Sequence, residues 1–330
     1  MRFVASTLDD LCRKLFPKLL TGGFVITPTR GRARERCGVL LELTKPRARL
    51  SRTETRGRPF SCLGELLWYL SGDNRLDFIR YYIEAYNEET GDGDSIYGGY
   101  GPRMFHQRGH DQVRNVLALL KTGPESRRAV IQIFNAEDIA QRHNEVPCTC
   151  FLQFMARGKR LHLIVAMRSN DAYIGLPHDV FCFTMLQELF ARSLRLELGT
   201  YRHFVSSLHL YERDRHLAEQ YLGEGVQSAI EMPAMPLGDP WPAVAKLLQA
   251  EEEIRNGLEP DPACFDMHPY WRDLIRLLQT LAATGNVIKI QAIKSAMSFK
   301  GYAPYIESRK TMKPRVQQLP HQLVLPLGSR

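Results

Sequence analysis

The chain has 330 residues, of which 44% are hydrophobic and 24% charged, and its formal net charge is +8. This balance is typical of a folded soluble protein and argues against a disordered one. No apolar run reaches the roughly 20 residues that a membrane-spanning helix needs. The first 20 residues also lack the uninterrupted apolar centre of a secretory signal. We therefore expect a cytoplasmic protein that does not bind a membrane.

The N-terminal half combines helix and strand patterns. Leucines at helical spacing predict an amphipathic helix over residues 1–20. Apolar runs at 24–27 and 39–43 predict strands on either side of an arginine-rich turn. Further helices are expected at 63–70, 76–85 and 111–121, with a Gly/Asp-rich loop at 91–101.

With the second half of the sequence included, the pattern predicts one α+β domain over residues 1–330. Strands are expected at 129–134, 151–155, 161–167 and 203–211, with a long apolar helix at 180–194. There is no internal repeat and no strong linker. We therefore expect a core at about 20–215, a helical insertion at about 216–297 and a C-terminal tail at 298–330.

The seven cysteines are odd in number and scattered through the chain, which argues against a disulfide framework. Cys148 and Cys150 are separated by one residue, and no second Cys/His pair lies at finger spacing. We therefore expect no metal site.

Cys148 follows a proline at the start of a predicted strand, where its thiol can face a cleft. An ordinary cysteine is more often a small buried hydrophobe. A reactive thiol needs positive charge nearby to lower its pKa, and Arg168 on the next predicted strand offers it. Arg168-Ser169-Asn170-Asp171 ends that strand. A charged side chain at the end of a buried strand needs a partner of opposite charge or a hydrogen bond.

Three other patterns have both a structural and a functional interpretation. Asp179 precedes the long apolar helix and can simply be its N-cap. Arg127 and Arg128 are either a solvated charge pair or a clamp for a phosphate. His209 and Tyr211 share one face of a strand, where such a pair most often belongs to the core.

Together and in this order, these motifs resemble the thymidylate synthase family over about residues 25–211. The segments that carry the resemblance are Gly64–Asp73, Pro147–Cys148, Gln153–Phe154, Arg168–Asp171, Gly175–Pro177 and His209–Tyr211, with a fainter echo at Phe299–Pro304. The resemblance implies a mixed β-sheet packed with helices and a homodimer with shared active sites. It also implies a pyrimidine nucleoside monophosphate as substrate and 5,10-methylenetetrahydrofolate as co-substrate, with no nucleic acid required.

The resemblance implies catalytic roles for Cys148, Glu65, Tyr100 and Asp179. Cys148 would be the nucleophile that attacks C6 of the pyrimidine. Glu65 would order water and assist proton transfer. Tyr100 matches the family's active-site tyrosine, and Tyr97 is a rival for that position.

Binding roles follow in the same way. Arg168 and Ser169 would bind the nucleotide phosphate with one arginine of the 30–34 turn, for which we favour Arg30, and Arg127 and Arg128 would reach the phosphate from the partner subunit. His209 and Tyr211 would hold the sugar 3′-hydroxyl, and Asp171 and Gly175 would lie near the folate.

Two departures bear on the base. Members that form thymidylate have asparagine at the position of Asp179, and that asparagine reads the uracil edge. A carboxyl group suits cytosine better, either protonated, donating to N3 and accepting from the N4 amino group, or ionised against an N3-protonated ring. The same change marks the deoxycytidylate hydroxymethylases, which also share Thr149 in place of the usual histidine.

Further departures bear on the reaction at C5. Synthases carry tryptophans that shield an intermediate from water, and residues 80–86 here contain none. Met167 also replaces a glutamine. Water is therefore expected to complete the reaction and give a hydroxymethyl product.

The sugar and the pathway are expected from composition alone. A chain rich in Arg, Leu and Ala suggests a GC-rich bacterial source and favours CMP over dCMP, as in nucleoside-antibiotic biosynthesis. Ala166 and Ala172 are small enough to leave space for a 2′-hydroxyl. The rivals are a thymidylate synthase that methylates dUMP and a non-catalytic nucleotide- or RNA-binding protein, which the net positive charge would suit.

Overall fold

The computed structural model describes residues 1–315. It divides into two compact units, residues 1–244 and the residues from 245 onward. The boundary falls inside the segment predicted as a helical insertion, and the single-domain organisation stays a prediction. Residues 316–330 of the predicted tail lie outside the described residues. No helix within residues 1–315 is long and apolar enough to cross a membrane.

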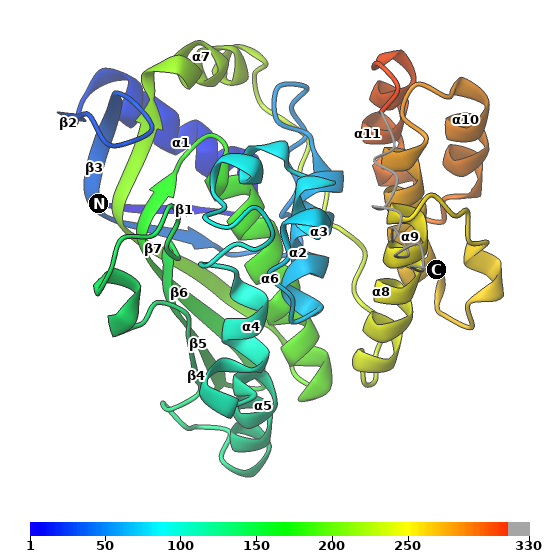
Figure 1. Cartoon of the computed structure of the whole chain (residues 1–330), viewed down its shortest axis with the longest axis horizontal. Coiled ribbons are helices and arrows are strands. Elements are labelled where there is room, and N and C mark those ends of the chain that lie inside the picture. The colour runs from blue at the N-terminus through cyan, green and yellow to red at the C-terminus, as the bar shows by residue number, and fades with distance from the viewer. Residues whose placement is uncertain (316–330) are drawn as a thin grey trace, which may run out of the picture. The chain divides into compact units, whose positions relative to one another are not determined.

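A mixed sheet of seven strands forms the centre of the first unit (Figure 1). Its strands are β1 (Arg2–Ala5), β2 (Phe24–Ile26), β3 (Ala33–Leu43), β4 (Val130–Gln132), β5 (Thr149–Arg157), β6 (Arg160–Asp171) and β7 (Glu197–Tyr211). The order is β1-β3-β7-β6-β5-β4, with β2 paired to β3. β1 with β3 and β6 with β7 are parallel, and the other pairs are antiparallel. The α+β fold with a mixed sheet is thereby confirmed.

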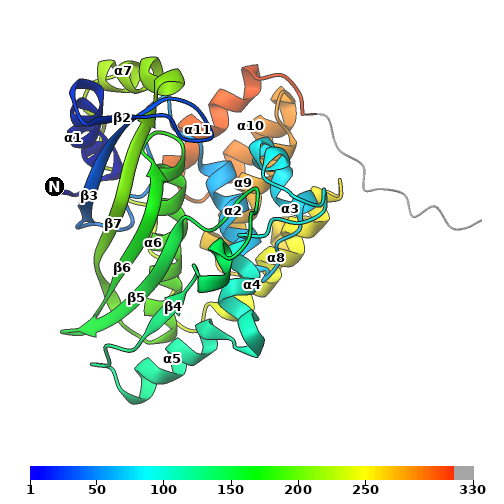
Figure 2. The same ribbon diagram turned by 60° about the vertical axis from the view of Figure 1, so that its left-hand side comes forward.

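The helices of the first unit are α1 (Leu8–Thr21), α2 (Pro59–Leu70), α3 (Leu76–Arg80), α4 (Tyr100–Phe105), α5 (Gln112–Thr122), α6 (Gly175–Ser193) and α7 (Arg215–Gly223). Helix α6 connects the parallel strands β6 and β7, as a parallel pair requires, and it lies against the sheet with α2 beside it (Figure 2). Leu161, Leu163 and Val165 of β6 are fully buried, whereas the residues between them are more exposed. One face of the sheet therefore forms the core with α6.

Helices also dominate the second unit. They are α9 (Pro269–Ala282), α10 (Val287–Ala296) and α11 (Ala303–Ser308), and α8 (Trp241–Arg255) runs across the boundary. Leu274, Ile275 and Leu278 on one side of α9 are buried. The mostly helical pattern predicted for this segment is thus correct.

Two predicted helices are wrong in part. Residues 2–5 form β1, because they pair in parallel with Leu40–Leu43 of β3, and this long-range pairing overrides the local helical pattern. The helix predicted over 76–85 ends at Arg80, and a 3₁₀ turn follows at Glu84–Glu88. Just after this end the ring of Tyr82 packs onto Gly64, where there is no Cβ to keep it away.

Candidate active site

A cavity of about 450 Å³ lies where β6 ends and α6 begins. This volume is within the range of small-molecule sites. We call it the active-site cavity. The predicted site residues that line it are Arg30, Glu65, Tyr100, Cys148, Arg168, Ser169, Asp171, Gly175, Asp179, His209 and Tyr211. The fold therefore brings together residues from distant parts of the sequence.

Other residues singled out by sequence lie elsewhere. Arg127 and Arg128 are exposed, and Arg128 lines a second cavity of about 330 Å³. Their predicted reach into a partner subunit stays a prediction. Ala166 and Ala172 do not line the active-site cavity, and their expected place beside a 2′-hydroxyl stays a prediction. Tyr97 lies outside the lining as well.

Cys148 stands directly before β5, beside a register shift between Thr149 and Phe151. Such bulges re-aim side chains near sites. Arg168 donates from Nε to the carbonyl of Pro147 and from Nη2 to that of Val146, both at 2.9 Å, and its Nη2 lies 3.8 Å from Sγ of Cys148. The arginine is thus held beside the thiol by the residues preceding it.

The pKa of Cys148 differs from the sequence-based expectation. Burial raises the pKa of the thiol to about 11, although the charge of Arg168 lowers it. The carboxylates of Glu145 and Asp179 raise it further. Arg168 does lower the pKa of Cys148, as expected, but burial outweighs this effect.

Tyr100 belongs to the wall beside the nucleophile. Its hydroxyl donates to Oγ1 of Thr149 at 2.9 Å and accepts the backbone N–H of Thr149 at 3.1 Å. Its ring stacks on Tyr69, with centroids 4.8 Å apart. The threonine after the nucleophile therefore anchors the tyrosine hydroxyl.

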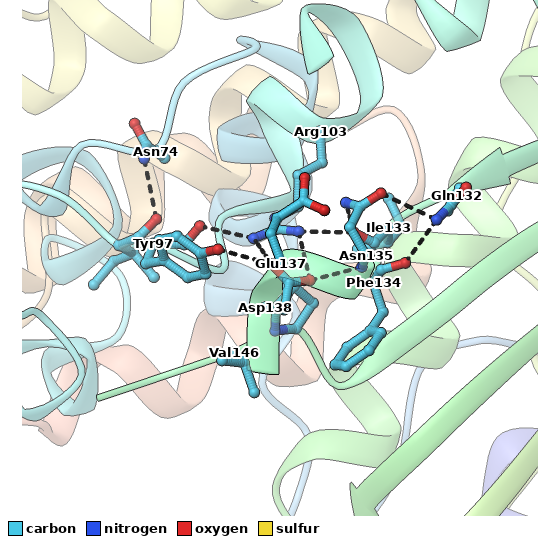
Figure 3. Close-up of polar contacts among 12 residues, drawn as sticks. Asn74, Tyr97, Arg103, Gln132, Ile133, Phe134, Asn135, Glu137, Asp138 and Val146 are labelled. Carbon is cyan, nitrogen blue, oxygen red and sulfur yellow. Dashed lines mark hydrogen bonds and ion pairs between the residues drawn. The ribbon is translucent and has the colours of Figure 1, made fainter. Parts of the chain in front are cut away.

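A buried ion pair holds α4, the helix that begins with Tyr100 (Figure 3). Arg103 of α4 donates from Nη1 and Nη2 to the two carboxylate oxygens of Asp138, each at 2.8 Å. Tyr97 donates to the same carboxylate at 3.0 Å, so its hydroxyl is engaged outside the active-site cavity. Tyr100 lines the active-site cavity and Tyr97 does not, while a catalytic role for Tyr100 stays a prediction.

Glu65, on α2, is held by three donors. Tyr69 and Tyr86 donate to its Oε1 at 3.0 and 2.9 Å, and Nδ1 of His178 lies 2.9 Å from Oε2. Burial alone would raise the pKa of Glu65, but His178 and the two tyrosines outweigh it and hold the pKa below the usual value. Glu65 is therefore ionised at neutral pH.

Asp179 is not the N-cap of α6, because the helix begins at Gly175 with Ile174 at the N-cap position. Asp179 lies in the second turn, where Nδ2 of Asn170 donates to its Oδ2 at 2.6 Å. Burial, together with the charge of Glu65, raises the pKa of Asp179 to about 8. The carboxyl group is therefore mainly protonated at pH 7. Met167 is packed at the same point, since its Sδ accepts from Nδ2 of Asn170 at 2.9 Å.

The ends of β6 and β7 supply the polar floor of the active-site cavity. Asp171 pairs in register with His209 across the two strands. Oδ1 of Asp171 accepts the N–H groups of Tyr173 at 2.8 Å and Ile174 at 3.3 Å. The rings of His209 and Tyr211 have centroids 4.9 Å apart. The shared face predicted for His209 and Tyr211 is therefore correct.

Residues 52–246 match the thymidylate synthase family. The chain belongs to this family. It is 31% identical over 168 residues to the thymidylate synthase of Buchnera aphidicola subsp. Acyrthosiphon pisum (strain APS), which covers 49% of this chain and 63% of the relative. It is 30% identical over 226 residues to the deoxyuridylate hydroxymethyltransferase of Bacillus phage SP01, covering 64% of this chain and 59% of the relative.

A third relative of the chain is the deoxyuridylate hydroxymethyltransferase of Pseudomonas phage M6. The two are 32% identical over 162 residues, which cover 48% of this chain and 46% of the relative. The chain thus spans less than two thirds of the length of these curated relatives.

The sequence did not predict several residues that line the active-site cavity. Glu89 forms an ion pair with Arg30 at the rim of the active-site cavity. Glu145 lines the same cavity, and burial and the charge of Glu89 raise its pKa to about 7. Its Oε2 is buried and has no hydrogen-bond partner within residues 1–315. In the sequence, the only sign that Glu145 belongs to the site is that it lies three residues before Cys148. Nothing in the sequence around Glu89 indicates that its loop reaches the site.

Three more were visible but unassigned. Asn170 lies inside a motif that carried the family resemblance, His178 directly follows another such motif, Gly175–Pro177, and Tyr86 lies in the segment noted for its lack of tryptophan. A tryptophan from another element does line the active-site cavity. It is Trp68 of α2, which packs against Tyr86 with ring centroids 5.4 Å apart. Across residues 1–315 there is no cluster of His, Cys, Asp or Glu that could hold a metal ion.

Proposed function

We propose that the chain is a cytidylate 5-hydroxymethyltransferase. It would transfer the one-carbon unit of 5,10-methylenetetrahydrofolate to C5 of CMP or dCMP, with water completing the product. The observation that carries this proposal is the buried Asp179 in the active-site cavity, held by Asn170 at 2.6 Å.

Asp179 suits a cytosine edge. Because its pKa is raised to about 8, chiefly by burial, the neutral carboxyl group has one O–H donor and one carbonyl acceptor at pH 7. Cytosine offers the complementary pair, an N3 acceptor and an N4 amino donor. A uracil edge offers an N3–H donor instead. Asn170 donates to Oδ2, so the proton of the neutral carboxyl group would sit on Oδ1, and an Oδ1–H directed at N3 would oppose uracil. The difference between the two bases is thus one of hydrogen-bond polarity.

The nucleophile and the phosphate site follow from the cavity lining. The thiolate of Cys148 would add to C6 of the pyrimidine. Arg168 lies 3.8 Å from Sγ, and with Ser169 and Arg30 it would bind the phosphate. Arg30 would first have to exchange its ion pair with Glu89 for the phosphate. His209 and Tyr211 would hold the sugar.

The co-substrate fits the floor of the active-site cavity. Oδ1 of Asp171 is occupied by two backbone N–H groups, while Oδ2 has no hydrogen-bond partner within residues 1–315 and can accept the N–H groups of a pterin ring. Gly175 leaves room beside it, because an added Cβ would meet nothing closer than 3.6 Å. When bound, methylenetetrahydrofolate supplies the one-carbon unit. Asp171 and Gly175 would orient it.

A polar wall supports capture by water. The tyrosine hydroxyl of Tyr86, the imidazole of His178 and the carboxyl group of Glu145 all line the active-site cavity. Trp68 is the one indole in the lining, so shielding is partial. Polar groups hold water in a site, and water at C5 gives a hydroxymethyl group where hydride would give a methyl group.

A homodimer with shared sites is part of the proposal. The face of the sheet away from α6 carries half-buried or exposed apolar side chains, among them Ile164 and Phe204, the latter 38% exposed. A face of this kind favours association. It would allow Arg127 and Arg128 to reach the phosphate in the partner subunit.

The relatives favour a different base, since two are named deoxyuridylate hydroxymethyltransferases and one a thymidylate synthase. The alternatives are therefore hydroxymethylation or methylation of a uridylate. The test incubates CMP, dCMP and dUMP separately with methylenetetrahydrofolate and determines the product masses. We expect hydroxymethyl products from CMP or dCMP, and none from Cys148→Ala. A methyl product from dUMP with unchanged cytidylates would contradict the proposal, and salt-dependent RNA binding without turnover would favour the non-catalytic rival.

A further inference from the structure

His178 bridges two helices inside the active-site cavity. It lies in the first turns of α6 and is buried, at 9% exposure. Its Nδ1 is 2.9 Å from Oε2 of Glu65, and its Nε2 is 3.1 Å from Oγ of Ser61, both on α2. The ring is therefore fixed at both nitrogens, with one of them directed at the carboxylate of Glu65.

The remaining contacts of Glu65 show what this imidazole adds. Tyr69 and Tyr86 donate to Oε1, whereas within residues 1–315 the partner of Oε2 is His178. Tyrosine hydroxyls bring no charge, whereas an imidazolium brings a full positive charge to a buried carboxylate. Removing it would leave the anion uncompensated, which is costly in the interior.

The surroundings favour a charged His178. Burial alone would lower the pKa of His178, but the Cys62 thiol and the Glu65 carboxylate outweigh it and raise the pKa to about 9. The other titratable groups near the pair lie on α2, η1 (Glu84–Glu88) and α6 and are Cys62, Tyr69, Tyr86, Asp179 and Cys182. Burial raises the pKa of Tyr69, Tyr86, Asp179 and Cys182. These four are therefore mainly neutral at pH 7, and His178 supplies the positive charge.

We propose that His178 is a positioning residue that acts through Glu65 and keeps this carboxylate available to accept a proton from the water that attacks the one-carbon unit. The inference rests on the proposed function. In this step the water oxygen bonds to the exocyclic methylene carbon on C5. The exocyclic double bond moves into the ring, the C6–Sγ bond breaks with its electron pair returning to Cys148, and the water proton passes to Glu65.

Three variants separate the charge from the hydrogen bond. His178→Phe removes both, His178→Asn keeps a donor without the charge, and the exposed His216→Phe serves as a matched control. In single-turnover reactions with cytidylate labelled with tritium at C5, tritium release precedes water addition. We expect His178→Phe to keep the tritium burst and to lose most of the hydroxymethyl product. His178→Asn should recover part of it.

The pH profile distinguishes this role from a merely structural one. Without His178 the buried Glu65 should have a higher pKa. The acid limb of product formation should therefore move up by about one pH unit or more. At pH values below this limb the variant should form about tenfold less product than the wild type. The alkaline limb, which in the wild type follows deprotonation of His178 near pH 9, should disappear in His178→Asn. An unchanged ratio of product to tritium across pH would overturn the inference.

A measurement without substrate keeps the two proposals apart. Carbon-13 NMR of histidine-labelled free protein should show one histidine that titrates near pH 9, absent in His178→Asn and shifted to lower pH in Glu65→Gln. A midpoint at or below the ordinary 6.5 would overturn the inference even if cytidylates are turned over. No turnover of any cytidylate by the wild type would overturn the proposed function, and with it the role in water addition.

Discussion

The side-chain amide of Asn170 lies 2.6 Å from Oδ2 of Asp179 and 2.9 Å from Sδ of Met167. This contact joins the end of β6 to the second turn of α6 and fixes the carboxyl group in the active-site cavity. Met167 and Asp179, the two positions at which the sequence was expected to depart from the thymidylate-forming members, therefore belong to one packed cluster.

Asp179→Asn should move the base preference toward uridylates. An amide presents N–H and C=O groups in fixed roles, and it can accept from N3–H of uracil while donating to O4. We expect the ratio of kcat/KM for cytidylate over uridylate to fall by a factor on the order of 10 or more. Parallel kinetics with CMP, dCMP and dUMP measure it, with Asp171→Asn as a variant that changes a carboxylate outside the base cluster. An unchanged ratio would count against base reading by Asp179.

Glu145→Gln should make Cys148 more reactive. Glu145 is one of the charges that raise the pKa of Cys148, so removing the charge lowers that pKa and increases the thiolate fraction at pH 8. The rate of alkylation by iodoacetamide should rise several-fold, since thiolate is the reacting form. Glu137→Gln, which changes an exposed carboxylate paired with Arg108, should leave the rate unchanged. Equal rates for the two variants would mean that Glu145 does not act on the thiol.

Asp138→Ala should destabilise the first unit. It leaves the buried guanidinium of Arg103 without its carboxylate, a change that costs about 3–5 kcal/mol in comparable buried pairs. Urea unfolding monitored by tryptophan fluorescence measures the loss. A loss below about 1 kcal/mol, within the range of exposed pairs, would show that the pair contributes little to the stability of the first unit.

The same pair contributes to acid stability. Burial alone would raise the pKa of Asp138, but Arg103 and the N–H of Asn135 outweigh it and hold the pKa below its usual 3.8. A lowered folded-state pKa means that the stabilisation is present above pH 3.8 and is lost as the pH falls through the folded-state value. Urea midpoints of the wild type and Asp138→Asn should therefore converge below pH 3.8. A difference that stays constant as the pH falls well below 3.8 would contradict this assignment.

The sequence predicts the α+β class and most strands, and the ordered family motifs predict many of the residues that line the active-site cavity. Tyr100 and Asp179 illustrate the limits. The motif identifies each residue, but only long-range packing decides between Tyr100 and Tyr97, and only the position of the N-cap at Ile174 excludes a capping role for Asp179. β1 could not be predicted, because its pairing with β3 is not visible in a local pattern.

Charge environments were the least predictable part. Arg168 lies beside Cys148 as expected, yet the pKa of the thiol rises because burial outweighs the arginine. The contributions of Glu89 and Glu145 come from loops whose approach to the active-site cavity depends on the whole fold. Net effects of this kind require the distances between groups, which a sequence does not contain.

The most direct test of the central claim is turnover in oxygen-18 water. The wild-type protein is incubated with an equimolar mixture of CMP, dCMP and dUMP and with methylenetetrahydrofolate, and each nucleotide product is analysed by mass. The account predicts a hydroxymethyl cytidylate that carries oxygen-18 in its new hydroxyl group. A methylated uridylate without the heavy oxygen, formed while both cytidylates remain unchanged, would contradict it.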